Sequence, residues 1–188
     1  PTVYRRIMHE VIQPTVKGLA AEGMSYTGFL YAGLMIDQTG TPRVLEYNCR
    51  SGDPETQPIL LRLRTDLTEL CMAALAGELH QAEIEWDSRA TLGVVMAAGG
   101  YPDNYVKGDI IEGLNSAETD QVKVFHAGTA IERGCVVTCG GRVLCVTALG
   151  DNVIAAQEAA YRSVQKINWP DAYYRPDIGY RALAHQSA

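Results

Sequence analysis

The sequence predicts an α+β fold, within the broader α/β class, divided into residues 1–88 and 89–188. Two observations indicate this division. Up to about Trp86, amphipathic helical stripes surround one apolar hairpin, whereas from Ala90 short strands alternate with glycine turns and lead into a last helix. The chain has 188 residues and is 47% hydrophobic, which is enough apolar material for the core of one large domain or two small ones.

The first predicted element is a helix, because apolar residues recur at helical spacing between Val3 and Ile12. Pro14 is expected to interrupt this stripe, since the residue before a proline avoids helical backbone angles. The stripe then resumes and ends at Gly23, a typical glycine at the C′ position. Because the sequence opens inside this amphipathic pattern at Pro1, we expect the chain to be a piece of a longer protein.

A hairpin is predicted next. Residues 29–36 are apolar at successive positions, which indicates a strand buried on both faces. Residues 37–40 are a turn signal, and residues 44–48 form the second arm.

Two helices are expected after the hairpin. Asp53 and Pro54 suit the N-cap and N1 positions of the first helix. Asp66 suits the N-cap of the second helix, with Glu69 as its capping-box partner and Gly77 at its end.

The second part is predicted to contain strands at 92–98, 123–126, 135–139 and 142–148. Gly140 and Gly141 favour a two-residue primed turn, and therefore a hairpin between the last two strands. Asp151 is expected to cap the last helix.

Composition argues against several classes of function. The net charge is −6 and the chain has no basic run, so it lacks the features of nucleic-acid or anionic-membrane binding. No apolar stretch approaches the roughly 18 residues that span a bilayer. The five cysteines are odd in number and lie in apolar or strand-like context, which favours free thiols and a cytoplasmic location. Cys135 and Cys139 lack the second cysteine pair of a common structural zinc site.

Glu46 and Asn48 are the candidate metal ligands. Alternate side chains of a strand share a face, about 6.6 Å apart at Cα, so both project together, and the same alternation predicts Val44 on that face. A carboxylate beside an amide oxygen suits Mg²⁺, which takes one or two such ligands together with nucleotide phosphates. Polar residues at a strand end also occur as solvated edge residues, so the spacing alone leaves both interpretations open.

Arg50, Asp53 and Glu55 are the other candidate site residues. A guanidinium after a strand end suits bidentate binding of a carboxylate or phosphate. Asp53 and Glu55 have two interpretations. They stabilise the start of a helix as its cap and as a charge near the positive end of its dipole, or their two carboxylates bind a substrate amine.

Several longer motifs lie at residues 27–35, 46–50, 52–57, 93–102, 124–128, 140–149 and 177–179. They resemble those of phosphoribosylamine–glycine ligase, also called glycinamide ribonucleotide synthetase, a family of the ATP-grasp superfamily. The likeness covers essentially the whole chain, and the Arg-x-Gly-Asp-Pro-Glu motif is highly specific to the family. One departure is Ser51, where the family usually has Phe or Leu.

This resemblance implies the C-terminal portion of an ATP-grasp domain, built of helices and an antiparallel hairpin, followed by a small α+β C-terminal domain. It also implies an ATP-dependent ligase of de novo purine biosynthesis that joins glycine to 5-phosphoribosylamine. ATP is the co-substrate, and Mg²⁺ or Mn²⁺ the cofactor. Glycine's carboxylate is phosphorylated, and the amine attacks the acyl phosphate to give glycinamide ribonucleotide, ADP and phosphate.

The resemblance assigns metal binding to Glu46 and Asn48, and contact with the reacting phosphoryl group to Arg50. Asp53 and Glu55 are then the candidate substrate-binding residues. Many ATP-grasp relatives have a second acidic ligand on the preceding strand, whereas the strand here, Tyr31 to Ile36, offers none.

Parts of the family's site are missing from this sequence, which has no glycine-rich phosphate loop and no paired nucleotide-contacting lysines. We therefore expect this chain alone to be inactive and to need an N-terminal part of the same protein. Lys107 is interpreted as a solvated loop lysine, and His126 as a structural histidine. Two alternatives stay open: another ATP-grasp carboxylate–amine ligase, and a non-catalytic truncated domain that acts as a scaffold.

Overall fold

The computed structural model describes residues 2–186, and they form two compact units. The first unit consists of residues 1–53 and 65–83, and the second of residues 54–64 and 84–188. The units interleave along the chain, because helix α3 (Thr56–Arg62) belongs to the second and helix α4 (Leu67–Ala76) to the first. Within the described part of the chain, no helix combines the length and apolarity that crossing a bilayer requires.

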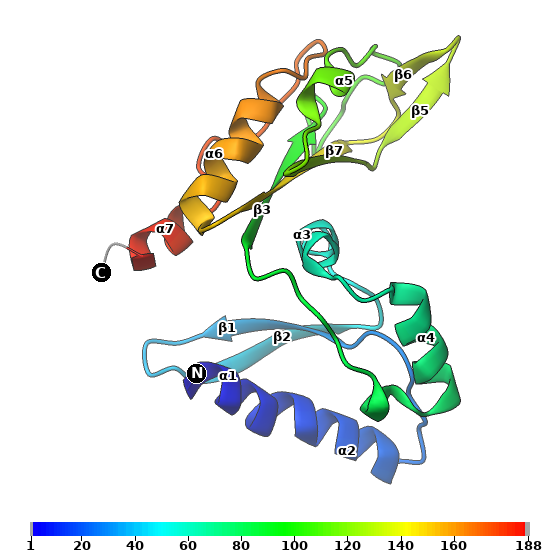
Figure 1. The fold of residues 1–188 in the computed structure, drawn as a ribbon, viewed down its shortest axis with the longest axis vertical. Coiled ribbons are helices and arrows are strands. Elements are labelled where there is room, and N and C mark those ends of the chain that lie inside the picture. Colours follow the sequence, from blue (N-terminus) through cyan, green and yellow to red (C-terminus); the bar gives the residue numbers. More distant parts are fainter. Residues whose placement is uncertain (1, 187–188) are drawn as a thin grey trace. The chain divides into compact units, whose positions relative to one another are not determined.

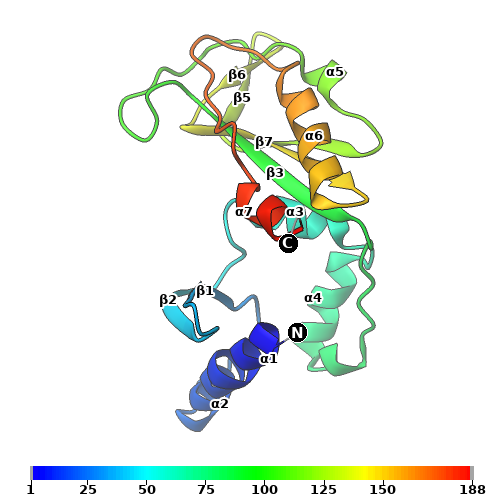
Figure 2. The same ribbon diagram turned by 90° about the vertical axis from the view of Figure 1, so that its left-hand side faces the viewer.

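The first unit begins with one continuous helical rod (Figures 1 and 2) made of α1 (Thr2–Ile7), the π-helical η1 (Met8–Ile12) and α2 (Gln13–Ala21). The predicted interruption at Pro14 is wrong, because Pro14 lies in the first turn of α2. A proline lacks the N–H group and clashes with the carbonyl group four residues earlier, and the wider π-helical turn before it accommodates both.

The end of this rod is as predicted. Gly23 has a φ of 75°, its N–H donates to the carbonyl of Ala20 at 3.1 Å, and the N–H of Met24 donates to Leu19 at 2.9 Å. This pair of bonds is a Schellman motif with glycine at C′.

Strands β1 (Tyr31–Ile36) and β2 (Pro42–Asn48) form the predicted antiparallel hairpin. Its turn is fixed by Asp37, whose Oδ1 accepts hydrogen bonds from the backbone N–H groups of Thr39 at 2.9 Å and Thr41 at 3.0 Å. The hydroxyl of Thr39 also donates to this carboxylate, and these bonds lower the pKa of Asp37.

The register of the hairpin shifts in its middle. Leu34 pairs with Val44, whereas Gly33 pairs with Glu46. Leu45 is therefore an extra residue on β2, which is a β-bulge.

The prediction that the first strand is buried on both faces is wrong. Phe29, just before β1, is 49% exposed, and Met35 within it is 57% exposed. The faces of a sheet are covered by other layers, and the helical rod packs on one face of this two-stranded hairpin. Among residues 2–53 and 65–83, Val11 is the one buried hydrophobic side chain.

Helix α4 begins and ends as predicted. Oδ1 of Asp66 accepts a bond from the N–H of Thr68, and Gly77 at the C-cap has a φ of 75°. A short 3₁₀ helix, η2 (Leu79–Gln81), follows.

Helix α3, in contrast, begins two residues later than predicted. Residues 53–55 form a turn, and Glu55 occupies the N-cap position with helical angles and no capping bond from its side chain. Asp53 and Pro54 are therefore not the N-cap and N1 residues.

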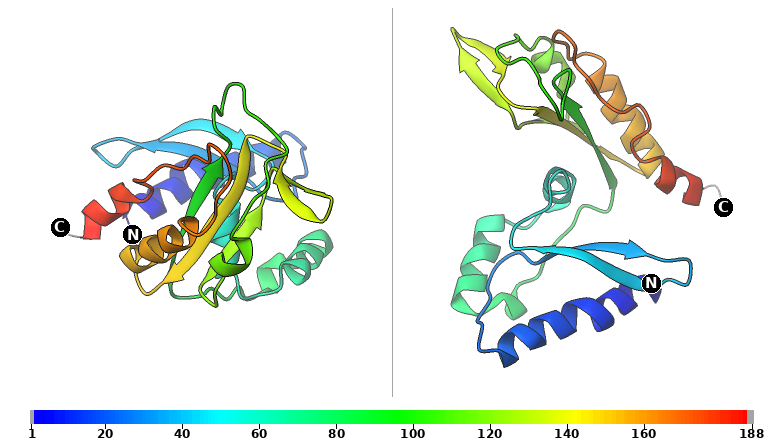
Figure 3. Two further views of the ribbon diagram at one scale, coloured as in Figure 1. Left: turned by 90° about the horizontal axis from the view of Figure 1, so that it is seen from above. Right: turned by 180° about the vertical axis from the view of Figure 1, so that it is seen from behind.

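The second unit is built on an antiparallel sheet of β3 (Ala90–Ala97), β7 (Arg142–Gly150) and β4 (Val122–His126), in the order β3-β7-β4. Helix α6 (Val153–Val164) packs along one face (Figure 3). On the other face α3 lies so close that a Cβ added to Gly93 would be 3.0 Å from Cγ of Pro58. The buried core includes Val94, Met96, Leu144, Val146, Ala160, Val164 and Trp169.

The predicted hairpin across Gly140 and Gly141 is wrong. Strand β6 (Cys135–Thr138) pairs instead with β5 (Thr129–Glu132), through Arg133 and Gly134, whose φ values are 51° and 82°. Positive φ at both positions is typical of a primed two-residue turn.

Gly140 instead lies where two segments of backbone meet. A Cβ on Gly128 would be 2.6 Å from the Cα of Gly140, and the N–H of Cys139 donates to the carbonyl of Gly128 at 2.7 Å. Glycine permits this approach.

The last described segment packs against α6. The cap of this helix is Asn152, one residue after the predicted Asp151, and its Oδ1 accepts from the N–H of Ala155 at 2.9 Å. Nε2 of Gln157 donates to the carbonyl of Ile178 at 2.7 Å, which holds the segment before α7 (Tyr180–Gln186). The remaining helix is α5 (Leu114–Ala117).

Candidate metal-binding site

The two faces of the β1–β2 hairpin differ. The hydroxyls of Thr15 on α2 and Tyr47 on β2 lie 2.8 Å apart, so Tyr47 is on the face that the helical rod covers. Neighbouring side chains of a strand point to opposite faces. Glu46 and Asn48 therefore lie together on the face away from the rod.

The register agrees with this placement. Glu46 pairs with Gly33 and Asn48 pairs with Tyr31, and residues two apart on β1 share a face. The prediction for Val44 is wrong, because Val44 pairs with Leu34, on the opposite face from Gly33. The bulge at Leu45 reverses the alternation between Val44 and Glu46.

These two residues fit a hard divalent cation. Glu46 is exposed and Asn48 half-buried, and each carries a side-chain oxygen, the ligand atom that Mg²⁺ prefers. Among the residues that the structure describes, no group of three or more histidine, cysteine or acidic side chains surrounds a possible ion. A cation here would take its other ligands from phosphates and water, as Mg²⁺ commonly does.

The sequence interpretation missed Gly33. A glycine inside an otherwise apolar strand is the available signal, since it often marks a close approach of another group. A Cβ at this position would lie 3.0 Å from Cγ and 3.6 Å from Oε1 of Glu46.

The three remaining candidates follow β2. Nη1 of Arg50 donates to the carbonyl of Ser51 at 2.9 Å. Asp53 and Glu55 are exposed on either side of Pro54. Asp53 belongs to the first unit with Arg50, and Glu55 belongs to the second.

The loop before β1 meets the end of β2. The hydroxyl of Tyr26 donates to the carbonyl of Phe29, and the pKa of Tyr26 is raised by burial and by a hydrogen bond with the thiol of Cys49. Cys49 lies between Asn48 and Arg50, beside the candidate site.

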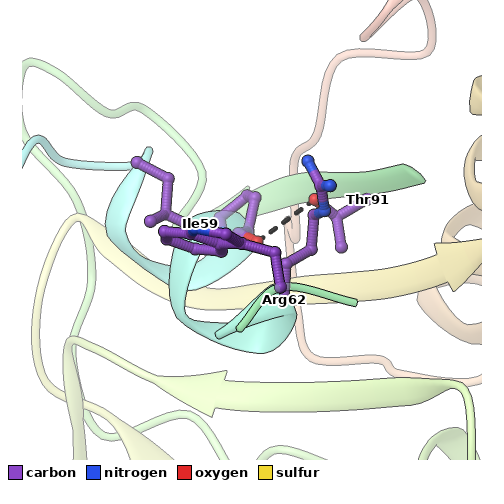
Figure 4. Close-up of a pocket in the computed structure, with 5 residues that line it drawn as sticks. Ile59, Arg62 and Thr91 are labelled. Carbon is purple, nitrogen blue, oxygen red and sulfur yellow. Dashed lines mark hydrogen bonds between the residues drawn. The ribbon is translucent and has the colours of Figure 1, made fainter. Parts of the chain in front are cut away.

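A pocket of about 420 Å³ lies in the second unit (Figure 4), lined by Pro58, Ile59, Arg62, Trp86 and Thr91. Nε and Nη2 of Arg62 donate to the backbone carbonyl of Asp87 at 3.0 and 2.9 Å. None of the five candidate residues lines this pocket.

Two further residues have structural contacts. Nδ1 of His126 lies 3.1 Å from Oγ1 of Thr129. Nζ of Lys107 lies 5.8 Å from the centre of the Tyr105 ring, within the range of a cation–π interaction.

Comparison with known proteins assigns the chain to a family. Residues 1–56 match the model described as "Phosphoribosylglycinamide synthetase, ATP-grasp (A) domain", and residues 91–181 match "Phosphoribosylglycinamide synthetase, C domain". Together the two stretches make up more than half of the chain. The chain belongs to the phosphoribosylglycinamide synthetase family.

Individual relatives agree with this membership. The chain is 61% identical to phosphoribosylamine–glycine ligase of Vibrio cholerae over 99% of its length, and 60% identical to that of Pseudomonas aeruginosa over 98%. It spans only 43% of the length of either relative.

Solved structures confirm the ATP-grasp and C-terminal α+β fold. Phosphoribosylamine–glycine ligase of Thermotoga maritima matches with a TM-score of 0.82 and 35% identity, over 95% of this chain and 44% of that chain. The biotin carboxylase domain of Hydrogenobacter thermophilus 2-oxoglutarate carboxylase matches with a TM-score of 0.54, over 75% of this chain and 31% of that one. Its identity of 14% indicates a shared fold alone.

Proposed function

We propose that this chain is the C-terminal part of a phosphoribosylamine–glycine ligase. The complete enzyme joins glycine and 5-phosphoribosylamine through glycyl phosphate, forming glycinamide ribonucleotide, ADP and phosphate in purine biosynthesis. The observation that carries this proposal is the 61% identity to a protein of that name over 99% of the chain. The shared face of Glu46 and Asn48 supports it.

Five residues have proposed roles. Glu46 and Asn48 hold Mg²⁺ or Mn²⁺, which neutralises phosphate charge when bound. Arg50 contacts the transferring phosphoryl group, whose negative charge a planar guanidinium stabilises. Asp53 and Glu55 bind substrate, and their exposed carboxylates suit an amine.

The proposal includes an N-terminal part of the same protein, which completes the ATP site. It also accounts for the apolar surface of the first unit, where Met72 is 62% exposed, Leu45 66% and Leu75 76%. Large apolar side chains so exposed are typical of surfaces that another segment covers. The further elements of the proposal are a cytoplasmic location, no nucleic-acid or membrane partner, and family domains at 1–88 and 89–188.

The test is an assay of ADP release by the complete protein and by the 188-residue chain alone. The complete protein should release ADP in the presence of Mg²⁺-ATP, glycine and 5-phosphoribosylamine, while the 188-residue chain alone should show negligible turnover. Replacing 5-phosphoribosylamine by other amines should abolish ADP release. A complete protein that prefers another acceptor would identify a different carboxylate–amine ligase, and one without any turnover would point to a scaffold.

A further inference from the structure

We propose that Gly33 is a positioning residue for the carboxylate of Glu46, an assignment that rests on the proposed metal-binding function of Glu46. The two residues are direct partners across the hairpin. The position of a Cβ on Gly33 is 3.0 Å from Cγ and 3.6 Å from Oε1 of Glu46. The Glu46 side chain therefore lies over the space that any other residue at position 33 would fill.

The bulge at Leu45 contributes to the same arrangement. An extra residue on one strand bends that strand and re-aims the side chains beside it. Here it brings Glu46, rather than Leu45, opposite Gly33. The bulge selects the residue that faces Gly33, and the missing Cβ gives its side chain room to lie across the partner strand.

The backbone itself does not require glycine at this position. Among the glycines with positive φ, such as Gly23 and Gly40, Gly33 is absent, so an alanine there meets no backbone strain. Alanine is also the better strand residue, since glycine within a strand loses more conformational entropy on folding. The unfavourable effect of a Cβ at position 33 is thus its close contact with the Glu46 side chain.

That contact is with a flexible side chain, which gives way more easily than backbone does. Gly33→Ala should therefore turn the Glu46 side chain away from its present position while leaving the hairpin intact. A displaced ligand weakens metal binding, and changes in residues that orient metal ligands typically cost about 10- to 100-fold in affinity.

The test is titration of the complete protein with Mn²⁺ in the presence of a non-hydrolysable ATP analogue, followed by water-proton relaxation, with thermal melting measured in parallel. Gly33→Ala should weaken Mn²⁺ binding by about tenfold with an unchanged or higher Tm. The matched control is Gly18→Ala in α2, where a Cβ has nothing within 4 Å, and it should leave the affinity unchanged. In a Glu46→Gln background, Gly33→Ala should have little further effect, since it acts through that carboxylate.

The outcomes separate this inference from the proposed function. If Glu46→Gln binds Mn²⁺ as well as the unsubstituted complete protein, the metal assignment fails, and the role of Gly33 fails with it. If Glu46→Gln weakens binding but Gly33→Ala does not, only the role of Gly33 is overturned. A loss of affinity with a lower Tm, or an equal loss in the Glu46→Gln background, would also overturn it, by showing that Gly33 acts through the fold.

Discussion

Arg89 binds the buried carboxylate of Asp87 through two side-chain hydrogen bonds, from Nε to Oδ1 at 3.0 Å and from Nη2 to Oδ2 at 2.7 Å. The backbone N–H of Arg89 donates to Oδ1 as well, at 2.9 Å. The guanidinium is the main cause, and this N–H the next, of a pKa of Asp87 far below its usual range. Since the carbonyl of Asp87 also accepts from Arg62 of α3, this residue joins the segment before β3 to that helix.

The ion pair of Asp87 and Arg89 predicts that the stability of the fold depends on pH. Because folding lowers the pKa of Asp87, its contribution to stability is fully present above the unfolded-state pKa of about 3.9 and is lost as the pH falls toward the folded-state value. Asp87→Asn should therefore lower Tm at pH 7, and the difference from the unsubstituted chain should shrink below about pH 4. Melting curves between pH 3 and 7 provide the measurement.

The control is Glu158→Gln, which removes an exposed i, i+4 partner of Arg162 at 3.7 Å. Exposed pairs contribute little, so Tm should hardly change. A constant difference between Asp87→Asn and the unsubstituted chain across the whole pH range would show that ionisation of Asp87 does not stabilise the fold.

Gly128→Ala should destabilise the second unit. A Cβ at Gly128 would lie 2.6 Å from both the carbonyl oxygen of Arg142 and the Cα of Gly140. Both are backbone atoms, so the strand ends must move apart, at a cost of about 2–3 kcal/mol in the free energy of unfolding. Chemical denaturation measures this, with Gly18→Ala as the control. An equal midpoint for the two variants would mean that the junction has room for a side chain.

Much of the fold could be predicted where the signal is local. Asp66, Gly77 and Gly23 mark helix ends through their own side chains and backbone preferences, and each occupies the expected position. The Gly140–Gly141 signal failed because glycine serves two purposes, turns and close backbone approach, which a single sequence does not distinguish. The primed turn at Arg133–Gly134 lacks the usual asparagine or aspartate signal.

The candidate site could be predicted only in part. The shared face of Glu46 and Asn48 follows from the two-residue period of a strand. Val44 lies on the opposite face from Glu46 because of the bulge at Leu45, and no residue type in the strand predicts that bulge. The exposure of β1 depends on which elements pack on the faces of the hairpin, a property of the tertiary structure rather than of residues 29–36.

Tyr47→Phe separates the two faces of the hairpin. It removes the bond to Thr15 and should lower the free energy of unfolding by about 0.5–1 kcal/mol. Mn²⁺ affinity should stay unchanged, because Glu46 lies on the other face. Tyr4→Phe, on a tyrosine that is 67% exposed, is the control. Loss of Mn²⁺ binding in Tyr47→Phe would contradict the assignment of faces.

Substitutions of the proposed metal ligands and of Arg50 should lower kcat/KM of the complete enzyme to different extents. Asn48→Ala should cause the smallest loss of kcat/KM, because a neutral amide oxygen holds a cation less strongly than a carboxylate does. Arg50→Lys should lower kcat/KM further, since an ammonium group does not reproduce the planar guanidinium and its fork of N–H donors. Glu46→Ala should cause the largest loss of kcat/KM.

The dependence of kcat/KM on Mg²⁺ concentration in Glu46→Ala tests the central claim most directly. Losing the cation removes several kcal/mol of transition-state stabilisation, so kcat/KM at limiting Mg²⁺ should fall by more than about a hundredfold. Tm should shift little, because Glu46 is exposed and its removal leaves no buried charge unpaired. Near-normal turnover of Glu46→Ala at limiting Mg²⁺ would contradict the metal assignment, and a large fall in Tm would show instead that Glu46 is structural.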